Sequence, residues 1–179
     1  PGSLAETTPY IGLEHMPRKS IALTEWGTTG GLASNKFEFK MGDILFGKLR
    51  PYFHKVGVAA IDGVCSTDVL VIRPKHPLWF SFVLCQASSS EMVDFANAGS
   101  TGTKMPRTSW DELRQFKLSI PPSELAQEFN AAVFPLVQRI QANIHESQTL
   151  ASTRDALLPK LISGQIKIAQ QPHATGAML

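Results

Sequence analysis

The sequence predicts an α+β fold, in which a mixed α/β domain with a twisted sheet and short helices is followed by one long C-terminal helix. Apolar runs with strand-like alternation lie between residues 41 and 72, and helix-like segments lie between 78 and 113. After Pro122 no glycine occurs until Gly164. We therefore expect a globular domain over residues 1–121, a long helix over 122–164 and a flexible tail over 165–179.

The strand predictions lie in the middle of the globular part. Residues 43–49 are rich in Ile, Leu and Phe, and apolar side chains alternate over residues 56–60. Asp62-Gly63 is a tight-turn signal, and an apolar run follows over residues 69–72, so segments 56–60 and 69–72 are predicted to form a β-hairpin. Alternation over residues 116–120 predicts a further strand.

Short helices are predicted in the second half of the domain. Segments 78–83 and 92–96 have helical character, with a break at Ser88-Ser89-Ser90 and a stop at Gly99. Ser109 and Glu112 have the spacing of a capping box, in which each side chain bonds the backbone amide of the other residue. This pair predicts the start of another short helix.

The long helix is predicted to begin at Ser123 and to have a possible bend at Pro135. About 38 helical residues would extend near 57 Å, far more than a small domain needs for its own core, so we expect a partner for this helix. The alternative is a terminal helix packed on its own domain. A heptad assignment gives two rows of seam positions: Phe129, Leu136, Asn143, Leu150 and Leu157 in one, and Val133, Ile140, Ser147, Arg154 and Leu161 in the other.

Composition sets broad limits on the function. The chain has 179 residues, of which 43% are hydrophobic and 18% charged, which fits one globular domain with an appendage. The net charge of +2 permits nucleic-acid binding without arguing for it. Cys65 and Cys85 lie in apolar stretches, and neither a membrane span nor a signal-peptide pattern occurs, so we expect a soluble, cytoplasmic protein.

Three polar clusters are candidates for DNA contact. The first combines cations with aromatic rings, which suits phosphate and sugar contacts, and its members are Lys48, Arg50, Tyr52, His54 and Lys55. The second is a small-residue loop over residues 99–107 that contains Thr101, Thr103, Lys104 and Arg107. The third is Asn35 with Lys36, beside a glycine-rich turn. Each cluster has a structural alternative, respectively a surface strand end, an ordinary turn and a turn-forming Asn.

Catalytic patterns are lacking in the sequence. The five histidines are scattered, and no Cys or His spacing matches a metal site. Neither a Ser-centred nucleophile elbow nor a glycine-rich cofactor loop occurs. Glu38-Phe39-Lys40 resembles the acidic-x-Lys end of a nuclease metal site, but no Asp completes the pair. We therefore expect a non-catalytic chain that holds no metal or cofactor.

Six phrases, taken in order, resemble the specificity subunits of type I restriction-modification systems. They are residues 10–15, 40–52, 62–68, 102–107, 120–122 and 154–161. In that family each subunit carries two target recognition domains and two long helices, which pack antiparallel as a spacer. Each domain reads one part of a bipartite DNA site. This chain resembles one domain plus one helix, either an excised C-terminal half or a natural half-length subunit.

The resemblance implies sequence-specific binding of double-stranded DNA on behalf of partner subunits. A methylase (M) subunit and a restriction (R) subunit are the implied partners, and S-adenosylmethionine, ATP and Mg are expected in those partners. The chain would pair with itself through the helix, as a homodimer in an antiparallel coiled coil, or with a second half. Two identical copies would read a palindromic site. The alternative function is a protein-protein scaffold that acts through its helix without reading DNA.

Overall fold

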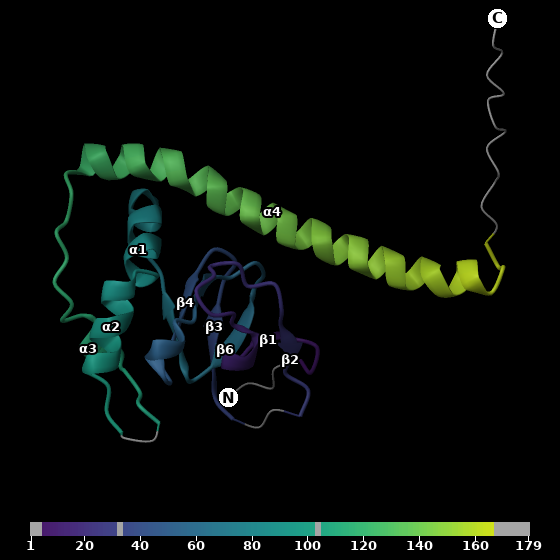
Figure 1. Ribbon diagram of the computed structural model, residues 1–179, viewed down its shortest axis with the longest axis horizontal. Helices are drawn as coiled ribbons and strands as arrows, with labels where there is room; N and C mark the ends of the chain where they lie inside the picture. The colour runs from purple at the N-terminus through teal and green to yellow at the C-terminus, as the bar shows by residue number, and fades with distance from the viewer. Residues whose placement is uncertain (1–4, 32–33, 103–104, 167–179) are drawn as a thin grey trace, which may run out of the picture. The chain divides into compact units, whose positions relative to one another are not determined.

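The computed structural model describes residues 5–31, 34–102 and 105–166, and it divides the chain into two compact units (Figure 1). The first unit covers Pro1–Ile144 and the second covers His145–Leu179. The first unit contains both sheets and the short helices. The α+β prediction is confirmed.

A four-stranded sheet has the order β2-β1-β6-β3. Its strands are β1 (Pro9–Ile11), β2 (Gly27–Thr28), β3 (Lys36–Phe39) and β6 (Gly63–Ser66). Strands β1 and β6 are parallel, whereas the other two pairings are antiparallel. The sequence did not predict any of these four strands.

A three-stranded antiparallel sheet has the order β5-β4-β7, with β4 (Ile44–Gly47), β5 (Val56–Val58) and β7 (Val69–Ile72). The predicted hairpin between segments 56–60 and 69–72 is wrong, because β4 lies between β5 and β7. All four residues of β4 and all three of β5 are buried, whereas β7 is buried only at Val69. The Asp62-Gly63 turn leads into β6, which belongs to the other sheet.

The short helices lie between and after the strands, and α1, α2 and α3 lie together beside β4 (Figure 1). They are η1 (Leu13–His15), η2 (Pro51–Phe53), η3 (Pro77–Trp79), α1 (Phe80–Ala87), α2 (Ser90–Ala98) and α3 (Trp110–Leu113). The Ser109–Glu112 capping box is confirmed, with bonds of 2.6 and 3.2 Å. The break after α1 and the stop at Gly99 are also confirmed.

The strand predicted over residues 116–120 is wrong, because the described chain has no strand there. The ring of Phe116 lies 5.2 Å from that of Phe95, and residues 117–120 are exposed. The alternating pattern therefore reflects one aromatic anchor and an extended connection. It does not reflect a half-buried strand.

The long helix α4 spans Ser123–Ile162 and continues through Pro135. Its first part packs within the first unit, where Ala126, Val137 and Ile144 are buried. Val137 belongs to the core cluster that also contains β4, β5 and the short helices. The structure therefore supports, for α4 up to Ile144, the alternative in which the helix packs on its own domain.

Polar contacts reinforce this packing. The Asn130 side-chain oxygen accepts hydrogen bonds from the backbone N–H (3.1 Å) and hydroxyl (2.8 Å) of the buried Ser81. The Gln141 amide donates to the Ala59 carbonyl at 2.9 Å. These three bonds satisfy groups that burial would otherwise leave without a partner, so they fix the position of this part of the helix on the domain.

Candidate nucleic-acid interface

Backbone pairing joins two of the loops that the sequence predicts to touch DNA. Leu49 and Arg107 form an antiparallel bridge, and the Arg50 amide donates to the Pro106 carbonyl at 2.7 Å. The Thr108 amide donates to the Lys48 carbonyl at 3.1 Å. Residues 48–55 thus form one surface with residues 99–102 and 105–108, which are distant in sequence. We call this surface the paired loops.

A third segment, which the sequence did not predict as a candidate, joins the paired loops. The Lys19 amide donates to the His54 carbonyl at 2.9 Å. The Arg18 guanidinium carbon lies 4.0 Å from the centroid of the Phe53 ring. The available sequence signal was the pair of adjacent cations after Pro17, which is too short to distinguish from any other surface pair.

The backbone at these contacts is unusual for residues other than glycine. Lys19, Arg50 and His54 have φ angles of 53°, 51° and 52°, in the left-handed region. Arg50 and His54 flank the helical turn η2, and their amides donate to the Pro106 and Pro51 carbonyls. Such conformations persist where the surroundings determine them, so the loop has a fixed shape.

Several predicted contact residues are already bonded to the protein. His54 Nε2 lies 2.8 Å from the Ser88 carbonyl, and the Lys55 ammonium donates to the Leu13 carbonyl. Burial lowers the pKa of Lys55, and the nearby Arg18 charge lowers it further. His54 and Lys55 thus hold the loop in place, and their bonded atoms are less available to a ligand.

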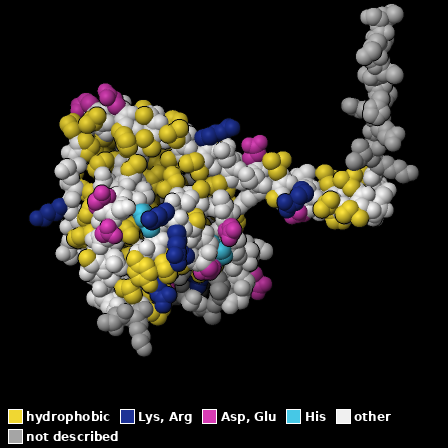
Figure 2. Space-filling view, viewed as in Figure 1, with side chains coloured by type: hydrophobic (Ala, Val, Ile, Leu, Met, Phe, Trp, Pro, Cys, Tyr) yellow, Lys and Arg dark blue, Asp and Glu magenta, His cyan; other side chains and the backbone are white. Residues whose placement is uncertain are grey.

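The remaining cations of the first cluster are better placed to bind a ligand. Tyr52 is exposed, and its ring lies 4.7 Å from that of Phe53 in an edge-to-face arrangement. Lys48 and Arg50 are half-buried, and neither takes part in an ion pair of the described residues. The Arg50 Nε atom is itself buried and has no hydrogen-bond partner within the described ranges. Figure 2 shows Lys and Arg side chains gathered near the middle of the first unit beside histidine.

The second and third clusters are only partly described. Thr101 is exposed and pairs with Arg107 through the backbone, whereas Thr103 and Lys104 lie outside the described residues. Lys36 begins β3, where its ammonium donates to Ser34 and lies 5.5 Å from the Tyr10 ring. Asn35 is exposed beside it. Lys36 of β3 pairs with Ser66 of β6. Asp68, two residues after Ser66, forms an ion pair with Arg107 of the paired loops.

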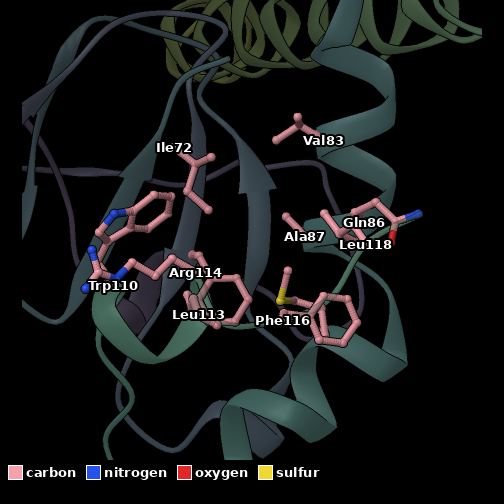
Figure 3. A pocket seen from close by; sticks show the side chains of 11 residues that line it. Ile72, Val83, Gln86, Ala87, Trp110, Leu113, Arg114, Phe116 and Leu118 are labelled. Atoms are coloured by element: carbon pink, nitrogen blue, oxygen red, sulfur yellow. The ribbon is translucent and has the colours of Figure 1, made fainter. Parts of the chain in front are cut away.

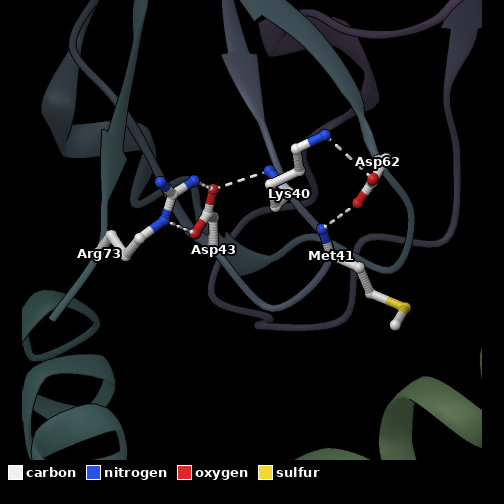
Figure 4. A network of polar contacts seen from close by, with 5 residues as sticks. All are labelled: Lys40, Met41, Asp43, Asp62 and Arg73. Atoms are coloured by element: carbon white, nitrogen blue, oxygen red, sulfur yellow. Dashed lines mark hydrogen bonds and ion pairs between the residues drawn. The ribbon is translucent and has the colours of Figure 1, made fainter. Parts of the chain in front are cut away.

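A separate polar network fixes the turn before β4 (Figure 4). Arg73 binds the buried Asp43 carboxylate through two nitrogens, and this bond raises the pKa of Arg73. Lys40 pairs with Asp62 at 3.2 Å, and Asp62 also accepts from the Met41 amide at 2.8 Å, which lowers the pKa of Asp62. Lys40 of the nuclease-like triplet is thus engaged in a structural ion pair. Among the described residues, no group of His, Cys, Asp and Glu could hold a metal.

An apolar pocket of about 310 Å³ lies between β4, β7 and the short helices (Figure 3). The pocket is lined by Phe46, Ile72, Val83, Gln86, Ala87, Met92, Trp110, Leu113, Arg114, Phe116 and Leu118. Trp110 at its edge is 52% exposed. The lining offers apolar contact and no paired acid and base, so it lacks the groups needed for acid–base catalysis.

The predicted seam of α4 divides into two kinds of position. Val133 packs against the core of the first unit and Ile140 is half-buried. The other predicted positions are exposed, namely Phe129, Leu136, Asn143, Ser147, Leu150, Arg154, Leu157 and Leu161. Leu136 and Leu150 are 63% and 62% exposed. We call Phe129, Leu136, Asn143, Leu150 and Leu157, one every seventh residue, the exposed row.

Curated proteins with similar sequences are specificity subunits of type I restriction enzymes. The EcoDI subunit from Escherichia coli is 33% identical over 92 residues, which are 51% of this chain and 20% of that protein. The MjaIX subunit from Methanocaldococcus jannaschii is 24% identical over 172 residues, 90% of this chain and 38% of that protein. The HindI subunit from Haemophilus influenzae is 28% identical over 129 residues, 68% of this chain and 28% of that protein. The chain thus spans less than half the length of each relative, and no family model matches it.

Solved structures of the same kind share the fold. The HsdS subunit from Thermoanaerobacter tengcongensis matches with a TM-score of 0.57 and 18% identity, over 96% of this chain and 45% of that one. A chain from a structure on complex assembly and conformational transition of the type I R-M system matches with a TM-score of 0.58 and 19% identity, at the same coverage. Within the described residues, no helix is long and apolar enough to span a bilayer.

Proposed function

We propose, from the premise that this chain is a relative of the specificity subunits of type I restriction enzymes, that its first unit recognises a specific sequence in double-stranded DNA. One observation of the structure carries the proposal furthest. The backbone bridge between Leu49 and Arg107 unites two candidate loops into one surface of fixed shape. Fixed loops are needed because base readout depends on the placement of side chains within a groove.

The residues of the surface have different proposed roles, in which some contact DNA and others hold the loop in place. Lys48 and Arg50 supply cations for phosphate or guanine, and the exposed Tyr52 supplies a ring for sugar or base edges. Thr101, Thr103, Lys104 and Arg107 of the second segment, with Asn35 and Lys36, extend the proposed contact. His54 and Lys55 act mainly as supports of the loop, because their polar atoms bond Ser88 and Leu13.

The chain would act for partner subunits and would not itself be an enzyme. We propose that it directs a methylase subunit and a restriction subunit to a bipartite site, in the cytoplasm where bacterial DNA lies. S-adenosylmethionine, ATP and Mg would be bound by those partners.

Function would require a second recognition domain, from a second copy or a second half of the subunit. The exposed row on α4 is the proposed contact, since its leucines and Phe129 are exposed to solvent in the described chain. Two copies related by a two-fold axis would read a palindromic site with an uncontacted spacer.

The test is selection of duplex DNA from a random pool by the full chain with its methylase partner. Enrichment of one bipartite sequence, with affinity that falls steeply with salt, is expected. Arg50→Ala should weaken binding to the selected site, whereas Lys117→Ala, on the exposed connection after α3, should not. If no sequence is enriched at either low or moderate salt, the proposal is wrong.

The exposed row also favours a second candidate function, a scaffold that acts through α4 and does not read DNA. The same experiment separates the two. A scaffold would capture the methylase subunit equally well with and without Arg50→Ala, and it would leave the DNA pool unselected.

A further inference from the structure

Two cations outside the predicted DNA-binding clusters lie beside the paired loops, where their segment contacts Phe53 and His54. Arg18 and Lys19 are both exposed. Within the described part of the chain, neither side chain has a carboxylate at ion-pair distance. Four of the six ion pairs of the described residues join an Arg to an Asp, whereas Arg18 and Arg50 of this surface take part in none of them.

The position of this segment is fixed by contacts to η2. Lys19 has a left-handed backbone and donates its amide to the His54 carbonyl. The His54 ring is anchored in turn at Ser88, 2.8 Å away. The His54 contacts therefore hold residues 18 and 19 in place as well as the loop that carries Arg50 and Tyr52.

The Phe53 ring holds two guanidinium groups. Arg18 lies 4.0 Å from its centroid and Arg50 lies 6.0 Å away, within the range of cation–π attraction. The ring is half-buried, so it presents little free face for stacking against a base. Its role at this place is to orient cations.

The surroundings concentrate positive charge. The Arg18 charge lowers the pKa of Lys55, whereas Glu14 opposes that effect. Arg18 therefore lies near Lys55, and it shares the Phe53 ring with Arg50. Like charges held together are relieved by an anion, and the phosphates of a duplex supply one at regular spacing.

We infer that Arg18 and Lys19 form a phosphate-binding arm that extends the DNA surface beyond the paired loops, with Phe53 as the positioning residue for Arg18. The inference rests on the proposed DNA recognition. The arm contacts the backbone and no base edge, so its contribution is the same for cognate and unrelated duplexes. Phe53 acts through the ring that holds the Arg18 guanidinium.

The test compares variants of the full chain, with the methylase subunit present, on the selected duplex and on a scrambled one. Arg18→Ala and Lys19→Ala should each weaken binding to both duplexes by about three- to tenfold and reduce the slope of log K against log salt by about one. Arg18→Lys should keep the slope. Lys117→Ala, an exposed cation away from the arm, is the matched control and should change neither quantity.

Phe53→Leu tests the positioning role. It should weaken binding at least as much as Arg18→Ala does, because Arg50 also lies near this ring. The double variant should lose less than the sum of the two single losses, because both changes remove the same oriented Arg18 guanidinium. An additive double variant overturns the role of Phe53. Circular dichroism and thermal unfolding of each variant separate a folding defect from a binding defect.

The outcomes distinguish the arm from the proposed function. If Arg18→Ala and Lys19→Ala bind like wild type while Arg50→Ala is weakened, the arm is wrong and DNA recognition stands. If wild type itself binds neither duplex at low salt, DNA recognition fails first. A loss confined to the selected duplex would also overturn the arm, because it would indicate base readout by these residues.

Discussion

Arg107 Nη2 lies 2.7 Å from Asp68 Oδ1, and this ion pair ties the second of the paired loops to the turn between β6 and β7. The Lys48 amide donates to the backbone carbonyl of the same Asp68 at 2.7 Å. One residue thus contacts both loops. Because the Arg107 side chain is 53% exposed, the ion pair contributes at most about 1 kcal/mol to stability.

Two substitutions that break this pair should have different effects on DNA binding. Arg107→Ala should weaken binding several-fold, since it removes a cation from the surface. Asp68→Asn should leave affinity unchanged or raise it, since it releases Arg107 and removes a negative charge. Both should lower the free energy of unfolding by about 1 kcal/mol or less. Fluorescence anisotropy with a labelled duplex measures the first effect and urea unfolding the second. Equal losses of affinity would mean that the pair acts only by holding the loop.

Asn130→Ala should destabilise the first unit by about 1 to 3 kcal/mol, because it leaves the buried N–H and hydroxyl of Ser81 without an acceptor. The matched control is Gln138→Ala, which changes an exposed polar residue of the same helix and should cost less than about 0.5 kcal/mol. Urea unfolding measures both. A cost for Asn130→Ala equal to that of the control would mean that α4 does not pack on the domain at this point.

Leu150→Glu and Leu157→Glu should each weaken self-association of the chain by about tenfold or more, since each places a charge where a second helix would bury a leucine. Ser152→Glu, on an exposed position between them, is the control and should have little effect. Analytical ultracentrifugation over a range of concentrations gives the dissociation constants. Association that is unaffected by both leucine changes would exclude the exposed row as the dimer contact.

Stability should fall in alkaline solution because of Cys65. Burial raises the pKa of this thiol from 9.0 to about 11, so above its ordinary value the unfolded chain loses a proton that the folded chain keeps. The stabilisation is complete below that ordinary value and is lost as pH rises toward the folded value. Between about pH 8 and about pH 10.5 the loss should be on the order of 1 kcal/mol.

Urea unfolding of two proteins that both carry Cys85→Ala checks this expectation, one with Cys65 and one with Cys65→Ala. The second thiol is removed because burial raises its pKa too. The protein with Cys65 should lose more stability over this range. Parallel losses in the two proteins would assign the alkaline effect to other groups.

The features that the sequence predicted correctly depend on neighbours along the chain. Ser109 and Glu112 lie one helical turn apart, and Ser123 starts a glycine-free stretch, so cap and helix follow from local chemistry. The strand pairing was wrong because β5 and β7 each pair with β4 and not with each other, and this choice of partner depends on contacts between segments that are distant in sequence. Strand β2 has two residues, too few to produce a pattern.

In the candidate interface too, residue types could be recognised from the sequence, whereas contacts between distant segments could not. Lys48, Arg50 and Arg107 were recognised as candidates from their residue types, but their backbone pairing was not foreseeable. Arg18 was missed because its partner, Phe53, is thirty-five residues away, and only the folded chain brings the ring and the guanidinium together. The roles of His54 and Lys55 as supports likewise depend on Ser88 and Leu13.

The bridge between Leu49 and Arg107 has a consequence for protein engineering. A segment transplanted from a relative at 48–55 would have to follow the same backbone path beside 105–108, because backbone hydrogen bonds set both segments. New specificities should therefore be sought by exchanging the two segments as a pair.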